Sequence, residues 1–153
     1  MSEIFSSIYE FGGLLPLYSA DLSDHLRGFD VSCTNYSGSP YYTYVGFFML
    51  TTCLFAGALQ YYIIDSPRYM RRSAWWITTT ILSVVNLVFA FVVVSNSLKP
   101  GKFCENLVIT TGDVVGFAMA NAICAFLFYL IMTSIPVFRA KSINCKYTTF
   151  YKP

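Results

Sequence analysis

The only histidine of the chain lies in a short polar segment, SADLSDHLRGFD, where acidic residues surround it. An imidazole among carboxylates is a ligand set that suits a metal ion, so His25 with Asp21, Asp24 and Asp30 is the first candidate for chemistry. Their spacing matches no known ligand pattern, however, and a solvated polar turn is the expected structure. We therefore predict no metal site in this segment.

The sequence motifs of the common enzymes are absent. The chain has no nucleophile elbow, no phosphate-binding loop and no HExxH helix. The mixed charge of the histidine segment has another use: repeated around a symmetry axis, Asp24, His25, Arg27 and Asp30 could form an electrostatic plug at the mouth of a pore. The sequence thus predicts a protein that is not an enzyme and that needs no cofactor.

Small and polar residues recur at spacings of four, three, four and seven along one apolar run: Thr79, Ser83, Asn86, Ala90 and Ser97. This spacing places them on one narrow face of a helix. Asn121 holds a similar place in a later run. Small residues let helices approach closely and buried amides bond across helices, so this face could serve packing within the chain. Alternatively, copies of the face line a water-filled path in a homo-oligomer, because three short helices cannot enclose a pore alone.

Three apolar runs must position these residues: 41–64, 75–98 and 114–138. Each exceeds twenty residues and contains no Asp, Glu, Lys, Arg or His. A helix needs roughly 20 residues to cross about 30 Å of hydrocarbon, so each run is long enough to span. The sequence predicts an all-α polytopic membrane protein with three transmembrane helices.

The N-terminal segment IFSSIYEFGGLLPLYS is shorter and more broken. Its apolar residues recur at helical spacing, but Glu10, Gly12-Gly13 and Pro16 interrupt them. We expect an amphipathic helix that lies at the membrane interface, is re-entrant or packs on the bundle. A short true span, which would be a fourth, and a soluble arm are the alternatives.

Basic residues are unevenly distributed among the loops. The turn 65–74 and the tail 139–153 hold seven Lys and Arg, against three in 1–40 and 99–113 together. The positive-inside rule therefore places the turn and the C-terminus in the cytoplasm. We divide the chain into an N-terminal amphipathic helix with an acidic outer segment (1–40), a transmembrane bundle (41–138) and a basic cytoplasmic tail (139–153).

Three arginines concentrate in the turn DSPRYMRRSAWW. Arg68, Arg71 and Arg72 most simply orient the protein and face anionic lipid. Guanidinium groups also match phosphate geometry, so the same residues could contact a nucleotide or a regulatory cytoplasmic partner. Asp65 before Ser66-Pro67 is typical of a helix stop and local turn. The net charge of +2, without a Lys/Arg stripe, argues against binding to duplex nucleic acid.

The five cysteines contain no CxxC pair, which excludes the usual zinc and redox spacings. The predicted topology puts Cys33 and Cys104 outside the membrane, in an oxidising compartment. Cys53 and Cys124 fall inside helices, and Cys145 falls in the cytoplasmic tail. A disulfide between Cys33 and Cys104 is therefore our hypothesis.

One stretch resembles a known family. Residues 61–69, YYIIDSPRY, followed by Trp75-Trp76, are similar to the first cytoplasmic turn of small multi-pass proteins of the Hailong type, which are encoded in bacterial anti-phage defence loci. The resemblance covers about residues 40–100. It implies a homo-oligomeric ion channel of the bacterial inner membrane whose opening disrupts the membrane potential, governed by a nucleotidyltransferase and its oligonucleotide product. That family is described as four-pass, one more than the runs found here.

Two functions follow as hypotheses. The first is a homo-oligomeric ion channel or pore, including a membrane-disrupting defence effector. The second is a non-catalytic accessory or scaffold subunit of a larger membrane complex. The channel predicts symmetric particles and ion flux, whereas the subunit predicts a monomer or a heteromer without flux. A carrier is disfavoured, because the spans hold no titratable acid or base and the chain has no internal repeat.

Overall fold

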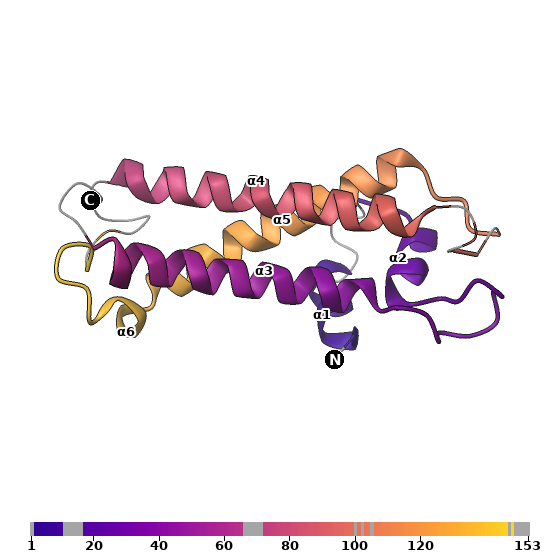
Figure 1. The fold of residues 1–153 in the computed structure, drawn as a ribbon, viewed down its shortest axis with the longest axis horizontal. Helices are drawn as coiled ribbons and strands as arrows, with labels where there is room; N and C mark the ends of the chain where they lie inside the picture. The colour runs from indigo at the N-terminus through magenta and orange to yellow at the C-terminus, as the bar shows by residue number, and fades with distance from the viewer. Residues whose placement is uncertain are drawn as a thin grey trace.

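The chain folds into a bundle of long helices. A computed structural model describes residues 2–10, 17–65, 72–99, 101, 103–104, 106–146 and 148. Helices account for 71% of the chain, and the described part contains no strand. Three long helices lie side by side, and the shorter helices lie beside them or towards their ends (Figure 1). The all-α prediction is confirmed.

The three long helices correspond to the three apolar runs. α3 (Tyr41–Ala58) continues into the π-helical turn η2 (Leu59–Ile63), and α4 (Arg72–Ser97) and α5 (Thr111–Ser134) follow. α3 with η2, α4 and α5 are each long and apolar enough to cross a membrane. The prediction of three such helices is confirmed, and the fold fits an integral membrane protein.

A capping box at the N-terminus and a proline after the C-terminus set the bounds of α5. Thr110 Oγ1 accepts from the Asp113 N–H at 3.3 Å, and the Asp113 carboxylate accepts from the Thr110 N–H at 2.9 Å. This capping box starts the helix at Thr111, three residues before the apolar run. Ile135 is extended because Pro136 follows it, and the four-residue helix α6 (Pro136–Arg139) comes next. The helix therefore covers 111–134, offset from the expected 114–138.

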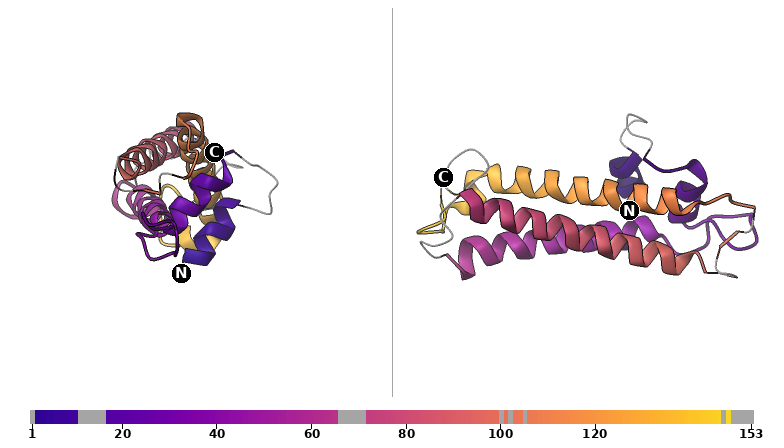
Figure 2. Two further views of the ribbon diagram at one scale, coloured as in Figure 1. Left: turned by 90° about the vertical axis from the view of Figure 1, so that its right-hand side faces the viewer. Right: turned by 90° about the horizontal axis from the view of Figure 1, so that it is seen from above.

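The N-terminal region forms two short helices, α1 (Ser2–Glu10) and α2 (Ala20–Arg27). α1 packs across α3 and α5 (Figure 2), burying Phe5 and Tyr9 and exposing Ile4 and Ile8. Its nine residues measure about 14 Å, far short of about 30 Å of hydrocarbon. The expected amphipathic helix is thus present and packs on the bundle. The alternative of a fourth span is not found in the described part, although residues 11–16 lie outside it.

Different parts of the chain close the two ends of the bundle. At one end, which we call the disulfide end, α2 packs on α3, and a disulfide joins the loops 28–40 and 98–110. At the other end, which we call the tail end, segment 140–146 binds the residue after α3 and η2. Asp65 and segment 140–146 therefore lie at the same end of the bundle.

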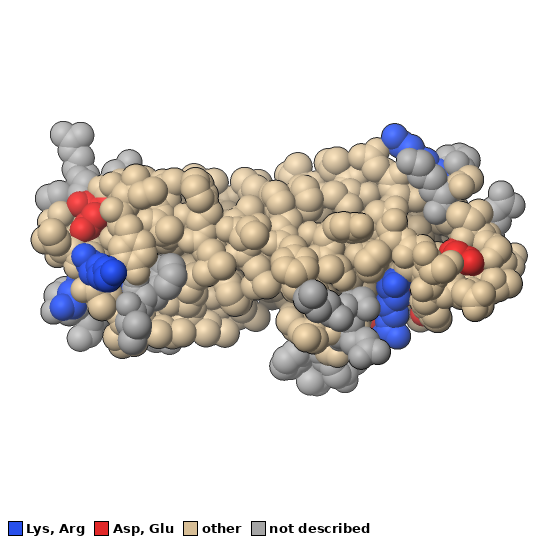
Figure 3. Space-filling view, turned by 60° about the horizontal axis from the view of Figure 1, so that its bottom comes forward, with Lys and Arg blue, Asp and Glu red and all other residues tan. Residues whose placement is uncertain are grey.

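The outer surface of the long helices is apolar along its middle. On the face that Figure 3 shows, charged side chains gather towards the two ends and leave the centre without them. Exposed aliphatic side chains include Ile77, Ile81 and Val88 on α4 and Ile123 and Ile131 on α5. A surface of this kind is suited to hydrocarbon rather than to water.

Candidate functional site

The polar face that we predicted for the second apolar run turns towards the inside of the bundle. Thr79, Asn86, Ala90 and Ser97 are each at most 3% exposed. Only Ser83 is intermediate. These side chains therefore pack within one chain, and the geometry favours helix packing over pore lining for this face.

Asn86 and Asn121 form the centre of a polar network in the middle of the bundle. Asn86 Nδ2 donates to Thr52 Oγ1 at 3.1 Å and to the Leu82 carbonyl oxygen at 3.0 Å. Asn121 Nδ2 donates to the Asn86 carbonyl oxygen at 2.9 Å, and Asn121 Oδ1 accepts from the Tyr9 hydroxyl at 2.8 Å. The network thus joins α1, α3, α4 and α5.

Two members of this network, Thr52 and Tyr9, were missed by the sequence analysis. Thr52 Oγ1 also donates to the Phe48 carbonyl oxygen at 2.8 Å, as hydroxyls in apolar helices commonly do. Nothing in the sequence separates it from its neighbour Thr51. Tyr9 had a usable signal, because its spacing of four from Phe5 places both on one helical face.

A second polar layer lies nearer the tail end. Trp75 Nε1 donates to Thr133 Oγ1 at 3.1 Å, and the Tyr129 hydroxyl donates to Gln60 Oε1. Gln60 belongs to the π-helical turn η2, a distortion that is frequent at functional sites. Its buried Nε2 has no hydrogen-bond partner in the described part of the chain. This layer ties α3, α4 and α5 together as the central network does.

His25 is buried in the disulfide end, so the expectation of a solvated polar turn is wrong for this residue. The segment forms α2 because Ser19 caps its N-terminus and because Leu22 and Leu26 bury one face together with His25, which is 2% exposed. Nε2 of His25 lies 2.9 Å from Ser97 Oγ. His25 thus packs between α2 and α4 instead of facing solvent.

The charged residues of the predicted plug are engaged separately within the chain. The Asp24 carboxylate accepts from the Tyr36 hydroxyl at 3.0 Å, and Arg27 pairs with Glu10 at 2.5 Å. Asp30 accepts hydrogen bonds in its own loop, the largest effect coming from Ser32, and these bonds lower the pKa of its carboxyl. The structure therefore does not gather these residues with His25 into one cluster.

The described residues contain no group of three or more His, Cys, Asp or Glu that could hold a metal ion. Cys33 and Cys104 instead form a disulfide with a Cα–Cα distance of 5.4 Å, which is the pairing that we hypothesised. Cys33 has a φ of 58°, in the left-handed region that non-glycine residues rarely adopt. The bond fixes the loop before α3 to the loop after α4.

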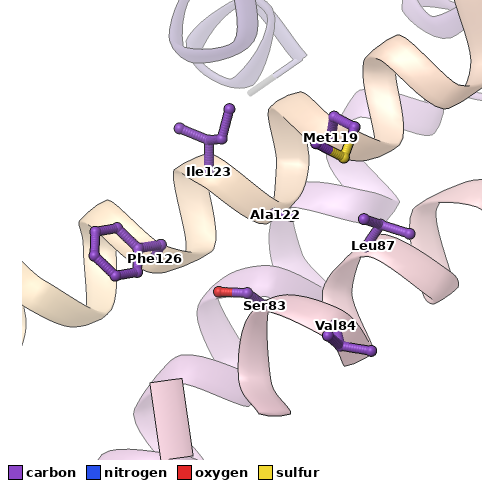
Figure 4. Close-up of a pocket in the computed structure, with 7 residues that line it drawn as sticks. All are labelled: Ser83, Val84, Leu87, Met119, Ala122, Ile123 and Phe126. Carbon is purple, nitrogen blue, oxygen red and sulfur yellow. The ribbon is translucent and has the colours of Figure 1, made fainter. Parts of the chain in front are cut away.

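An apolar groove of about 260 Å³ lies between α4 and α5 (Figure 4). It is lined by Ser83, Val84, Leu87, Met119, Ala122, Ile123 and Phe126. Ser83 Oγ is buried and has no hydrogen-bond partner among the described residues. On the same helix, Thr78 and Thr79 each donate to the carbonyl oxygen four residues earlier. Ser83 is thus the member of the predicted polar face that is left unsatisfied, and it lies in this groove.

Asp65 binds the C-terminal segment at the tail end. Its carboxylate accepts from the backbone N–H groups of Ile143, Asn144 and Cys145 at 2.7–2.9 Å and from the Ser142 hydroxyl at 2.8 Å. Consecutive N–H groups that converge on one anion form a nest. Asp65 therefore acts over almost eighty residues of sequence. The local turn expected at Ser66-Pro67 lies outside the described residues.

The predicted arginine contact with an anion or a partner falls largely outside the described residues. Arg68 and Arg71 are not described, and Arg72 is described only as the first residue of α4. Binding of a nucleotide or of an acidic partner by these arginines stays a prediction.

Replacing Asp65 by asparagine should release the C-terminal segment at neutral pH. Hydrogen bonds, the largest effect coming from the Ile143 N–H, lower the pKa of Asp65 from 3.8 to about 2. The docked form is therefore favoured above the ordinary pKa, and this contribution is lost as the pH falls towards 2. Asp65→Asn removes the negative charge at neutral pH and so weakens the binding of the C-terminal segment. Release of the segment should expose the buried Cys145 thiol, which should then react with a maleimide faster than in the wild type. Labelling is measured by mass spectrometry.

Asp30→Asn is the matched control, because Asp30 organises a loop at the opposite end and should leave Cys145 labelling unchanged. An Asp65→Asn variant that labels at the wild-type rate would contradict the assignment of Asp65 as the anchor of this segment.

No protein-family profile, curated protein or solved structure matches the chain. The geometry of the polar core, the groove and the two closed ends is therefore the basis on which its function is inferred.

Proposed function

We propose that this chain is a non-catalytic subunit of a larger membrane assembly, rather than a protomer that lines a pore with its polar face. The observation that carries this proposal is the direction of that face: Asn86, Asn121 and Ser97 bond inside the chain. A ring of copies would present mainly apolar side chains, aliphatic and aromatic, to one another and to any path between them. Such a lining does not replace the hydration shell of an ion.

The groove between α4 and α5 supports a contact with a neighbouring helix. Ser83 and Ala122 are small residues at the middle of two spanning helices, and small residues allow close helix approach. The surface that the groove exposes is almost wholly apolar. We therefore assign the groove to a transmembrane helix of a partner subunit that presents an apolar side chain at that depth.

We also propose that the disulfide end faces the outside of a bacterial inner membrane and that the tail end faces the cytoplasm. Seven of the ten Lys and Arg belong to the turn and tail regions at the tail end. The Cys33–Cys104 disulfide supports the same orientation, because such bonds persist in oxidising compartments.

The test compares the particle mass and the ion flux. The purified chain alone should have the mass of one 17.3 kDa chain after correction for detergent, and liposomes containing it should lose potassium no faster than empty ones. In a mild-detergent extract of its native membrane, the chain should migrate as a larger complex. Ser83→Phe, which fills the groove, should shift it back to the single-chain mass.

Val92→Phe is the matched control, because Val92 is 48% exposed on α4 and does not line the groove. It should leave the complex intact. Symmetric particles of the purified chain together with potassium flux would contradict the subunit proposal.

The homo-oligomeric channel is the second candidate. The observation that favours it is the apolar groove itself, since its small residues Ser83 and Ala122 would let a helix of a second copy approach closely. In that case the groove would be the contact between copies, and Ser83→Phe would abolish both oligomer and flux. A defence effector gated by an oligonucleotide, as the Hailong-type resemblance implies, would in addition lose its response when Arg68, Arg71 and Arg72 are replaced by glutamine.

A further inference from the structure

His25 joins three elements at the disulfide end. Its ring stacks on Tyr41 at the start of α3, with centroids 5.4 Å apart, and meets Phe103 edge-on at 6.2 Å. Its Nε2 lies 2.9 Å from Ser97 Oγ at the end of α4. One side chain of α2 therefore contacts two spanning helices and the loop that carries Cys104.

The neighbouring hydrogen bonds fix which nitrogen of His25 carries the proton. Ser97 Oγ donates its hydrogen to the Val94 carbonyl oxygen at 2.7 Å. A hydroxyl has a single hydrogen, so Ser97 Oγ can only accept from His25, and Nε2 is the donor. Nδ1 then carries a lone pair. It is buried and has no hydrogen-bond partner in the described part of the chain.

A second proton on the docked ring would be poorly accommodated. It would go to Nδ1. The hydrogen-bond and aromatic partners of the ring in the described part of the chain are Ser97, Tyr41 and Phe103, and none of them carries a carboxylate. Asp24 and Asp21 on α2 already accept from a tyrosine hydroxyl and from a backbone N–H. Lys99, two residues after Ser97, is exposed and offers no acceptor. A buried charge without a partner is costly.

The other charges around α2 are paired and hold it from the side. Arg27 pairs with Glu10 of α1 at 2.5 Å. The Asp113 carboxylate of α5 accepts from the Ser19 N–H at 2.8 Å. Neither contact involves His25, so a change at the histidine can loosen α2 while its flanks stay attached.

We propose that His25 is a pH-sensitive latch, which holds α2 on the disulfide end at neutral pH and releases it on acidification. The latch goes beyond the proposed function, because it operates whether the chain is a subunit or a channel. If the disulfide end faces outward, the signal is the pH outside the membrane.

The direction and size of the effect follow from proton binding. Burial lowers the pKa of docked His25 below its ordinary value of about 6.5. A released, hydrated His25 takes up its proton near pH 6.5. The population of released α2 therefore increases relative to docked α2 as the pH falls below about that value. Between pH 7.5 and pH 5.5 the released population should rise by at most about tenfold, the limit reached when the docked ring takes up no proton in this range.

The test uses the full chain in lipid nanodiscs. Because the chain contains one histidine, isotope labelling of histidine gives a single ring signal, which should titrate below pH 6.5 or vanish as α2 is released. Hydrogen exchange of residues 20–27, corrected for the intrinsic effect of pH on exchange, should accelerate from pH 7.5 to pH 5.5 by up to about tenfold. Exchange in residues 114–134 should not change and serves as the internal control.

His25→Gln keeps a donor for Ser97 but cannot titrate, so exchange of its α2 should be independent of pH. The proposal is overturned if the wild-type ring titrates at or above pH 6.5 with α2 still protected. It is also overturned if the pH response survives in His25→Gln. Should His25→Gln fail to fold, Ser97→Ala replaces it: loss of the Nε2 acceptor should speed exchange of α2 already at pH 7.5, and unchanged exchange would count against the latch.

Discussion

Replacing Gly116 by alanine should detach the N-terminal segment from α5 and lower the free energy of unfolding by about 1–3 kcal/mol. A Cβ at this position would lie 1.7 Å from the Leu17 carbonyl oxygen and 2.8 Å from its carbonyl carbon. These are backbone atoms, which cannot rotate away as the end of a side chain can. Residues 17–18 would therefore have to move away from α5.

Gly112→Ala, in the same helix, is the matched control. A Cβ there would meet only Thr110 Oγ1, at 3.4 Å, which is ordinary contact. Alanine is also favoured over glycine inside helices by about 0.5–1 kcal/mol, so this variant should be neutral or slightly more stable. For each variant, the thermal midpoint in detergent measures the stability, and hydrogen exchange of residues 4–10 measures the attachment of the N-terminal segment. Parallel destabilisation by the two variants would refute the close approach of Leu17.

Replacing Asn121 by leucine should destabilise the bundle by about 1–3 kcal/mol. The substitution keeps the approximate volume but leaves the Tyr9 hydroxyl buried without its acceptor and removes the donor to the Asn86 carbonyl oxygen. The cost comes mainly from the unsatisfied hydroxyl, because the Asn86 carbonyl oxygen belongs to a continuous helix.

A double-mutant cycle with Tyr9→Phe isolates this hydrogen bond. Tyr9→Phe alone removes the hydroxyl, and in the double variant Asn121→Leu no longer leaves it stranded. The double variant should therefore cost less than the sum of the single ones. Unfolding of the four forms in detergent provides the measurement, and strict additivity would show that Tyr9 and Asn121 do not interact.

The three spans were predictable because the requirement is physical and local. A stretch that crosses hydrocarbon must be long and free of charge, and both properties can be counted along the sequence. The grouping of Asn86 with Thr79 and Ser97 was predictable for a similar reason, since helical spacing alone puts them on one face. The direction of that face was not predictable, because both a neighbouring helix and a pore would accept small polar residues.

Contacts between distant residues account for most of what the sequence did not reveal. Tyr9 meets Asn121 across 112 residues, and Asp65 meets the segment near Asn144 across 79. No local pattern encodes such a pairing. The burial of His25 was missed for a related reason. Its acidic neighbours suggested a solvent-exposed position, whereas its spacing of three from Leu22 places it on the buried face of α2.

The Cys33–Cys104 bond turns the α3–α4 hairpin into a covalent ring, since the two sulfur atoms lie at its open end and the chain between them includes both helices. The ring can close only after the second helix has brought Cys104 back to the side from which the first departed. Once the bond has closed, neither helix can leave a membrane separately from the other. If the disulfide end faces an oxidising compartment, as we propose, non-reducing gels of chains arrested during synthesis should show the bond only once α4 has been inserted.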